Sequence, residues 1–140
     1  MTDGPRDEAV ADELAIRNII ARLAQLADMG DLDDYLKLWT EDASWEIPGA
    51  PARKGHAEIL QGAKERRASG MQGPGTSTRH VVTTLAVQVD GADTASSDSY
   101  FLYVADTTSS PRLGSIGHYH DTLHRSADGW RVARRQITFG

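Results

Sequence analysis

Histidine and aspartate are the residue types in this 140-residue chain that are best suited to proton transfer. A neutral imidazole, with a reference pKa near ~6.5, accepts a proton at neutral pH. A carboxylate buried in the protein can likewise be held there for chemistry. Two residues are candidates for such chemistry: Asp28 at the end of a helical segment and His80 in a strand-like one. The absence of cysteine excludes thiol nucleophiles, disulfides and thiolate metal sites.

The surroundings of Asp28 follow from the helical pattern of residues 8–29. On an ideal wheel Asp28 falls well off the centre of the apolar stripe, beside Arg17, Ala21 and Ala24. That position favours a solvated carboxylate at a helix end. The small alanines permit close packing around the carboxylate without requiring it, so burial of Asp28 remains an alternative. The stripe itself contains Ile16, Ile19, Ile20, Leu23, Leu26 and Ala27.

His80 lies in a segment, 79–89, whose residues alternate between two faces of a predicted strand. Small side chains share the face of His80, as expected beside a cavity, although a strand histidine is more often structural or exposed than catalytic. The other face, with Val81, Val87 and Val89, is predicted to be the outer one. The face of His80 also carries Val82, Thr84 and Ala86, and the outer face Arg79, Thr83 and Leu85.

Three further histidines, His118, His120 and His124, share one face of a predicted strand at 113–125. A His-x-His pair can bind zinc, copper or iron, but no third ligand is evident. We therefore predict no metal and an outward position for these histidines, with Tyr119 on the inner face. In the last strand Arg134 and Arg135 point to opposite faces.

The elements that position these residues indicate an α+β fold in one domain, 8–140, after a flexible lead-in, 1–7. Helices come first and are followed by a four-strand antiparallel run, so the helices should pack on one face of a sheet. The glycine-rich stretch 70–75 lacks the Gly-Lys-Ser/Thr of a phosphate-binding loop and is predicted to be a flexible connection. The predicted helices are 8–29, a short one capped by Asp31 or Asp33, and 55–70, and the strands are 43–47, 79–89, 94–105, 113–125 and 130–139.

Charge and hydropathy narrow the partners and the location. A net charge of -5 argues against a general nucleic-acid or anionic-membrane surface. No apolar run approaches the ~20 residues of a membrane span. The polar start, MTDGPRDE, has no apolar signal region, so we expect a cytoplasmic protein.

The order of several segments resembles the SnoaL-like proteins of the nuclear-transport-factor-2-like superfamily, from about residue 8 to 139. The segments are "DMGDLDDYLKLWTEDASWEI", "KGHAEI", "TRHVVTTLAVQVDGADT", "GHYHDTLHR" and "DGWRVARRQ". The resemblance implies a cone-shaped, strongly curved, mainly antiparallel sheet wrapped around N-terminal helices and enclosing a pocket. This agrees with the α+β pattern.

Within that superfamily, scytalone dehydratase and hexachlorocyclohexane dehydrochlorinase use a catalytic histidine–aspartate dyad. The segments that carry the dyad match Asp28 and His80, and an arginine of the dehydrochlorinase matches Arg135. The resemblance therefore implies that Asp28 faces inward. The dehydratase has a tyrosine before its aspartate, where this chain has Ala27, and its second pocket histidine has no evident counterpart.

The resemblance implies an enzyme in which His80 removes a proton from carbon, Asp28 orients the imidazole and Arg135 stabilises the developing negative charge. The expected reaction is an elimination, by a dehydratase or dehydrohalogenase, or a proton-transfer isomerisation of a small apolar or aromatic substrate, with no cofactor or metal. A homodimer or homotrimer is expected. The alternative is a non-catalytic ligand-binding or assembly subunit. The residues predicted to contact the substrate are Tyr119, Trp45, Phe101, Tyr103, Ala24 and Gly117.

Overall fold

The computed structural model describes residues 4–140, so the first part of the predicted lead-in lies outside the described residues. The first helix begins at Pro5, three residues before the predicted start. No helix within residues 4–140 is long and apolar enough to cross a bilayer. The elements are α1 (Pro5–Met29), α2 (Leu32–Leu36), β1 (Trp39–Glu46), β2 (Arg53–Lys54), α3 (Gly55–Ala68), β3 (Arg79–Val89), β4 (Thr94–Ala105), β5 (Arg112–Ser126) and β6 (Gly129–Phe139).

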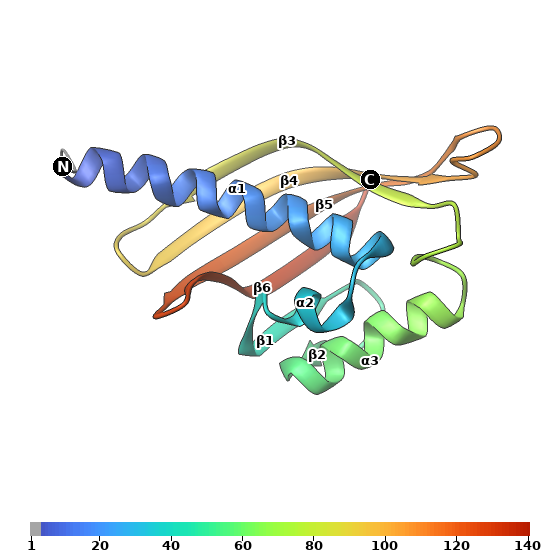
Figure 1. The fold of residues 1–140 in the computed structure, drawn as a ribbon, viewed down its shortest axis with the longest axis horizontal. Coiled ribbons are helices and arrows are strands. Elements are labelled where there is room, and N and C mark those ends of the chain that lie inside the picture. The colour runs from blue at the N-terminus through green and yellow to red at the C-terminus, as the bar shows by residue number, and fades with distance from the viewer. Residues whose placement is uncertain (1–3) are drawn as a thin grey trace.

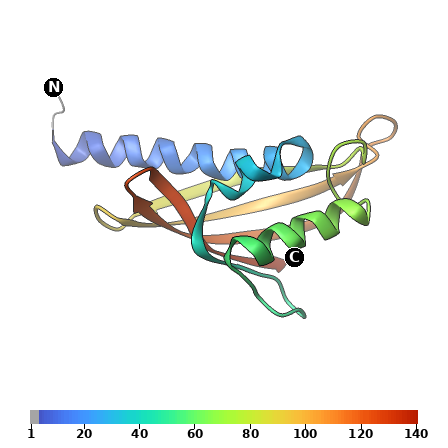
Figure 2. The ribbon, with the colours of Figure 1, turned by 60° about the horizontal axis from the view of Figure 1, so that its bottom comes forward.

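The six strands form one curved mixed sheet in the order β2-β1-β6-β5-β4-β3. All neighbouring strands are antiparallel except β1 and β6, which are parallel. The long helix α1 lies along one face of this sheet, and α2 and α3 lie on the same side (Figures 1 and 2). This arrangement confirms the predicted α+β class and its mainly antiparallel sheet. The sequence pattern did not reveal β2 or the parallel pairing.

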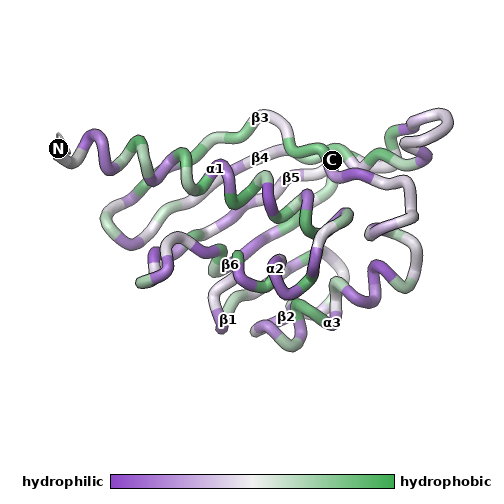
Figure 3. Tube along the Cα trace, viewed as in Figure 1, coloured by the Kyte–Doolittle hydropathy of each residue, from purple (hydrophilic) through white to green (hydrophobic). Residues whose placement is uncertain are grey.

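Helix α1 packs on the sheet through the apolar stripe expected from its spacing. Ile16, Ile20 and Leu23 are at most 1% exposed, and they share one core with Leu123 and Val132 of the sheet. Burial of such a side chain stabilises the fold by about 1.5–3 kcal/mol. Along α1, hydrophilic and hydrophobic segments alternate, as expected for an amphipathic helix (Figure 3).

Asp31 caps the short helix α2, which decides between the two predicted caps. Its carboxylate accepts hydrogen bonds from the backbone N–H groups of Asp33, at 2.7 Å, and Asp34, at 3.3 Å. The helix turns Tyr35 inward, where it is 3% exposed. Trp39 is fully buried and opens β1, which therefore begins four residues before the predicted strand.

A β-bulge in β3 changes which residues face outward. Between Thr83 and Ala86 the strand has one residue more than its partner β4, and Thr84 has a φ of 39°. The side-chain alternation therefore reverses after the bulge. Val87 and Val89, like Leu85, pack against the core, so the prediction that they face outward with Val81 is wrong. Thr84 and Ala86, predicted inward, are exposed.

The outer face of the sheet still exposes large apolar side chains on three adjacent strands. Val81, Tyr100 and Ile116 are 42%, 57% and 44% exposed. Leu102 lies opposite both Val81 and Ile116 in the strand register, so these residues adjoin one another. An apolar surface of this kind on a monomer is typical of an interface. This surface is consistent with the homo-oligomer expected from the sequence, which stays a prediction.

We predict that sedimentation at micromolar concentration gives a species of two or three 15.2 kDa chains. Ile116→Glu should dissociate it, because a charge on the buried face would lose its hydration. Leu14→Glu is the control, since Leu14 is 58% exposed on α1, away from this face. A stable 15.2 kDa species from the parent chain would contradict the prediction.

Candidate active site

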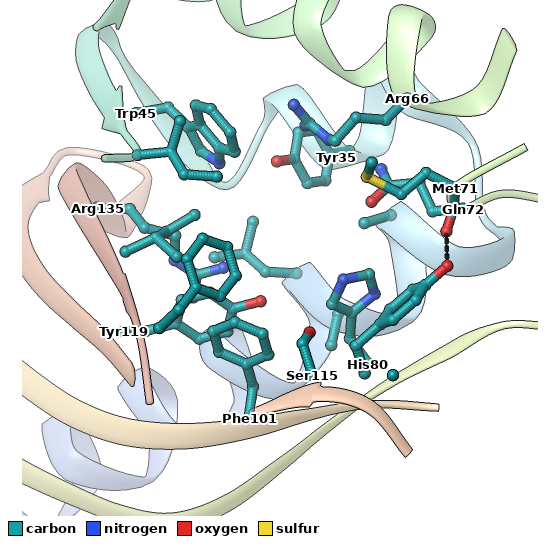
Figure 4. Close-up of a pocket in the computed structure, with 18 of the residues that line it drawn as sticks. Tyr35, Trp45, Arg66, Met71, Gln72, His80, Phe101, Ser115, Tyr119 and Arg135 are labelled. Carbon is teal, nitrogen blue, oxygen red and sulfur yellow. Dashed lines mark hydrogen bonds between the residues drawn. The ribbon is translucent and has the colours of Figure 1, made fainter. Parts of the chain in front are cut away.

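A cavity of about 440 Å³ lies inside the cone and is lined by residues from α1, α3, the loop after α3 and the sheet. His80 and Arg135 reach it (Figure 4). Five of the six predicted contact residues also line it: Ala24, Trp45, Phe101, Tyr103 and Tyr119. The sixth, Gly117, is not among the lining residues. A Cβ at this glycine would lie 2.2 Å from the ring of Phe101, so its absence makes room for that ring.

Asp28 and His80 form a buried pair at the wall of this cavity. One carboxylate oxygen of Asp28, Oδ1, lies 2.8 Å from Nδ1 of His80. The other, Oδ2, accepts the backbone N–H of His80 at 2.8 Å. Asp28 is only 2% exposed, and the side chain of His80 is 17% exposed. The structure thus brings the two predicted residues together, within the distance expected for a catalytic pair.

Asp28 is buried because β3 covers the flank of α1 on which it lies. On the same flank, Arg17 donates a hydrogen bond to the carbonyl of Leu85 in β3, at 3.2 Å. The helical wheel places Asp28 correctly on this flank, but it cannot show that a strand packs there. The solvated position favoured by periodicity is therefore wrong.

Arg67 of α3 holds the end of α1 in place. Its Nη2 donates to the carbonyl oxygens of Leu26, Ala27 and Gly30 at 2.9, 3.3 and 2.7 Å. These oxygens lie at the C-terminal end of α1, where the negative end of the helix dipole lies, and the Leu26 carbonyl also accepts the backbone N–H of Gly30 at 3.0 Å. A cation at this position therefore stabilises the turn that contains Asp28.

The pairing fixes the chemical state of the His80 ring. A carboxylate accepts hydrogen bonds and donates none, so Nδ1 carries a hydrogen, and in the neutral ring Nε2 then keeps its lone pair. Aromatic rings flank the imidazole: Tyr103 at 5.1 Å and Phe101 at 6.2 Å between centroids. The hydroxyl of Tyr103 donates to the carbonyl of Met71, 2.6 Å away, and this bond ties the glycine-rich loop to the sheet.

Arg135 is buried in the cavity wall and forms an ion pair. Its Nε and Nη2 donate to the two carboxylate oxygens of Asp121 at 2.8 and 3.0 Å. Burial alone lowers the pKa of Arg135, but the charge and hydrogen bonds of Asp121 outweigh it and leave that pKa raised. The guanidinium lies 3.8 Å from the ring centroid of Tyr119. Arg134, on the other face, pairs with Glu46 at the surface, as the strand alternation predicts.

The Tyr119 phenol is a hydrogen-bond donor held in the cavity wall. Burial raises its pKa to about 12, although the charge of Arg135 opposes this shift. The phenol therefore keeps its proton at neutral pH. Its ring stacks on Phe101, with centroids 4.3 Å apart. Within residues 4–140 its hydroxyl makes no hydrogen bond and is free to donate to a ligand.

Sequence reasoning missed five polar residues of the cavity: Tyr35, Arg66, Gln72, Arg112 and Ser115. Arg66 sits in a helix whose charged residues mostly face solvent, and Gln72 lies in the loop predicted to be a flexible connection. Tyr35 lies on the short helix α2, and its sequence pattern does not indicate contact with a pocket. No sequence signal separates Arg66 from its neighbour Arg67, because both are consecutive basic residues at the end of α3.

The outer-face histidines lie outside the cavity lining, as predicted for His118 and His120. Both contact one carboxylate oxygen of Asp98 on the neighbouring strand, His118 through Nε2 at 3.0 Å and His120 through Nδ1 at 2.7 Å. The hydrogen bond with His120 contributes most to lowering the pKa of Asp98. Asp98 thus shares the face of these histidines. The spacing of residues within one strand does not indicate this, because Asp98 comes from the neighbouring strand.

We predict that Asp121→Asn lowers the free energy of unfolding by about 3–5 kcal/mol, because it leaves the buried Arg135 without a counter-charge. Glu46→Gln is a matched control, since it breaks the pair of the adjacent Arg134 at the surface, where the side chains are 50% and 28% exposed. The control should cost no more than about 1 kcal/mol. Urea unfolding measures both, and equal losses would contradict the account of Arg135.

The raised pKa of Tyr119 predicts a loss of stability at high pH. The folded chain holds this phenolic proton more tightly than the unfolded chain, whose reference pKa is 10.0, so stability should fall as the pH rises from 10 to about 12. In Tyr119→Phe the fall should be smaller by about 2–3 kcal/mol at most. Urea unfolding across this range measures it, with the exposed Tyr100→Phe as control. An unchanged pH dependence would contradict the burial of this phenol.

Known structures share the fold described here. An NTF2-like protein with a cystatin-like fold from Novosphingobium aromaticivorans is 27% identical, with 96% of this chain and 85% of that chain covered and a TM-score of 0.84. A candidate aromatic ring hydroxylase from the same bacterium is 26% identical, with 93% and 90% covered and a TM-score of 0.78. A candidate scytalone dehydratase, also from it, is 17% identical, with 97% and 89% covered and a TM-score of 0.78, which shows the fold alone.

None of the curated proteins compared with this sequence matches it. The sequence model of the SnoaL-like domain, however, matches residues 8–136, nearly the whole chain. Together with the cone-shaped sheet and its internal cavity, this match establishes that the chain belongs to the SnoaL-like family.

Proposed function

We propose that this protein is a small-molecule enzyme in which His80 removes a proton from a carbon atom of the substrate. The observation that carries the proposal is the Asp28 carboxylate, buried and bound through both oxygens to His80, whose ring lies at the cavity wall. A surface histidine needs no such support. A general base does, because its ring must keep one tautomer and one orientation.

The proposed reaction begins with transfer of the substrate proton to Nε2 of His80, and Asp28 stabilises the imidazolium that forms. The electrons of the broken C–H bond form a double bond as a neighbouring leaving group departs, which is an elimination. Alternatively they move into an adjacent carbonyl to give an enolate, and His80 returns the proton to another carbon, which is an isomerisation. Neither route requires a cofactor for this step.

Tyr119 is the proposed donor to the oxygen that gains negative charge. Its phenol is protonated at neutral pH and faces the cavity, and its hydroxyl has no hydrogen-bond partner within residues 4–140. A donor placed in a site shielded from water stabilises the transition state more than it would in solution. Arg135 supports this phenol from beneath the ring. Because Asp121 already neutralises Arg135, we assign Arg135 to holding Tyr119 rather than to direct stabilisation of the charge.

The substrate proposed for this site is small and largely apolar or aromatic. Apolar and aromatic side chains form most of the cavity wall, and about 440 Å³ is room for a molecule of one to three rings. The candidate scytalone dehydratase that shares this fold is in keeping with an elimination, although its sequence is too distant to carry the reaction over.

A ligand-binding module without catalysis is the second candidate, favoured by the same apolar cavity. An assembly subunit is less well supported, because its interior would be filled by side chains. The binding module and the enzyme differ in what His80 does, since a binder needs no base and tolerates the loss of its imidazole. Turnover therefore separates them.

We predict that His80→Ala lowers turnover by about 10²–10⁴, the usual contribution of a positioned proton-transfer group. Asp28→Asn should also be severe, because an amide offers one acceptor oxygen where His80 presents two donors. The measurement is turnover of a substrate found by screening small cyclic alcohols, halides and enones, with thermal melting of each variant.

His118→Ala is the control for these variants, since it removes an imidazole from the outer face of the same sheet. It should leave turnover within about twofold of the parent. If His80→Ala retained turnover within about threefold at unchanged stability, the base would lie elsewhere and the binding module would be the better account.

A further inference from the structure

Arg66 differs from the other arginines of the cavity in its charge balance. Three arginines are among the lining residues of the described chain, Arg66, Arg112 and Arg135. Arg135 is neutralised by Asp121, and Nε of Arg112 donates to Asp106 at 2.7 Å. Arg66 makes no hydrogen bond or ion pair with any carboxylate within residues 4–140. It therefore brings an uncompensated positive charge to the cavity.

The surroundings of Arg66 make this charge costly in the empty protein. Its guanidinium lies over the ring of Trp45, 4.5 Å from the ring centroid. The adjacent carboxylate, Glu65, is turned to Arg53 instead. Burial lowers the pKa of Arg66, and the charge of Arg53 adds to this effect. Tyr35 and, more weakly, Glu65 oppose it but leave the pKa lowered. A cation removed from water without a partner is unfavourable, so an anion that reaches it gains the missing attraction.

Two neutral donors accompany Arg66 on the same side of the cavity. The hydroxyl of Tyr35 makes no hydrogen bond within residues 4–140, and Figure 4 shows the ring of Tyr35 beside the Arg66 side chain. The amide nitrogen of Gln72 is buried without a partner. Hydrogen-bond donors thus gather there without a protein acceptor, while His80 lies on another side of the cavity (Figure 4).

We propose that the cavity binds a small aromatic or alicyclic carboxylic acid whose carboxylate is held by Arg66, with Tyr35 and Gln72 as neutral donors. The planar guanidinium matches the two oxygens of a carboxylate. One uncompensated cation suits a single negative charge better than a phosphate. This proposal adds a substrate class to the proposed function. Binding of the acid does not depend on that function, whereas its conversion by His80 does.

The test is isothermal titration calorimetry with 1-naphthoate and its neutral analogue 1-naphthamide, which share one ring system. The parent protein should bind the acid about 10- to 100-fold more tightly than the amide, as expected for charge-assisted hydrogen bonds. Arg66→Gln should abolish this preference and leave the affinity for the amide within about threefold. Tyr35→Phe should lower the affinity for the acid by a smaller factor than Arg66→Gln does.

Arg112→Gln is the matched control, because Asp106 already compensates that arginine. It should keep the preference for the acid. Thermal melting shows whether Arg66→Gln folds, and we expect no loss of stability because a half-buried charge without a carboxylate partner is removed. If the variant does not fold, Arg66→Met provides the same comparison with a neutral side chain of similar length.

His80→Ala separates this proposal from the proposed function. It should keep the preference for 1-naphthoate over 1-naphthamide, whether or not the protein proves to be an enzyme. Equal affinity of the parent for the acid and the amide, or no binding of the acid at millimolar concentration, would overturn the assignment. A preference that survives in Arg66→Gln would overturn it as well.

Discussion

The buried carboxylate of Asp28 is the constraint on which the rest of the site depends. A carboxylate with 2% exposure must receive hydrogen bonds, because its desolvation would otherwise cost several kcal/mol. Both of its donors come from one residue, His80, through the backbone N–H and the ring. The end of α1 and the start of β3 are therefore tied together at the cavity, and neither can shift without leaving a buried charge unpaired.

Other parts of the fold serve this contact. Arg67 binds the last carbonyls of α1 and so fixes the turn that carries Asp28. The bulge in β3 lets the strand turn His80 to the cavity at one end and Val87 to the helix at the other. Helix packing, strand register and the polar pair are thus parts of one arrangement.

Some polar groups around the cavity are paired within the protein, and others are available to a ligand. Asp28 and Asp121 each have donors, from His80 and Arg135, so these two acids are satisfied by the protein itself. Tyr119 and Arg66 are not satisfied in the same way: within residues 4–140 the Tyr119 hydroxyl has no hydrogen-bond partner, and the Arg66 guanidinium lies over an aromatic ring without a hydrogen bond to a carboxylate. The groups left without partners are those that a ligand would meet.

Much of the fold follows from local sequence, because helical and strand periodicity mark the boundaries of α1 and β3–β6 to within a few residues. The position of Asp28 does not follow, since burial of a helix flank depends on which strand packs there. Val87 and Val89 were misplaced because one extra residue in β3 reverses the alternation, and no residue type announced it. Strand alternation predicts the face of Gly117, but it does not show that the ring of Phe101 fills the space beside this glycine.

Arg66 and Gln72 could not be predicted for a related reason. They come from a helix end and a loop that meet the cavity only in the folded chain. The His80–Asp28 pair was found through the resemblance of its two segments to known dyads, and not through spacing. Periodicity within one segment says nothing about its distance from another segment, so their proximity can be predicted only from a fold that is already known.

The most direct test of the central claim is the tautomer of His80, measured by nitrogen-15 NMR of the imidazole at neutral pH. If Asp28 holds the ring as a base, Nδ1 carries the hydrogen and Nε2 gives the signal of an unprotonated nitrogen, and Asp28→Ala removes this preference. A ring that carries its hydrogen on Nε2 in the parent protein would contradict the account, because its lone pair would then face Asp28 and not the cavity.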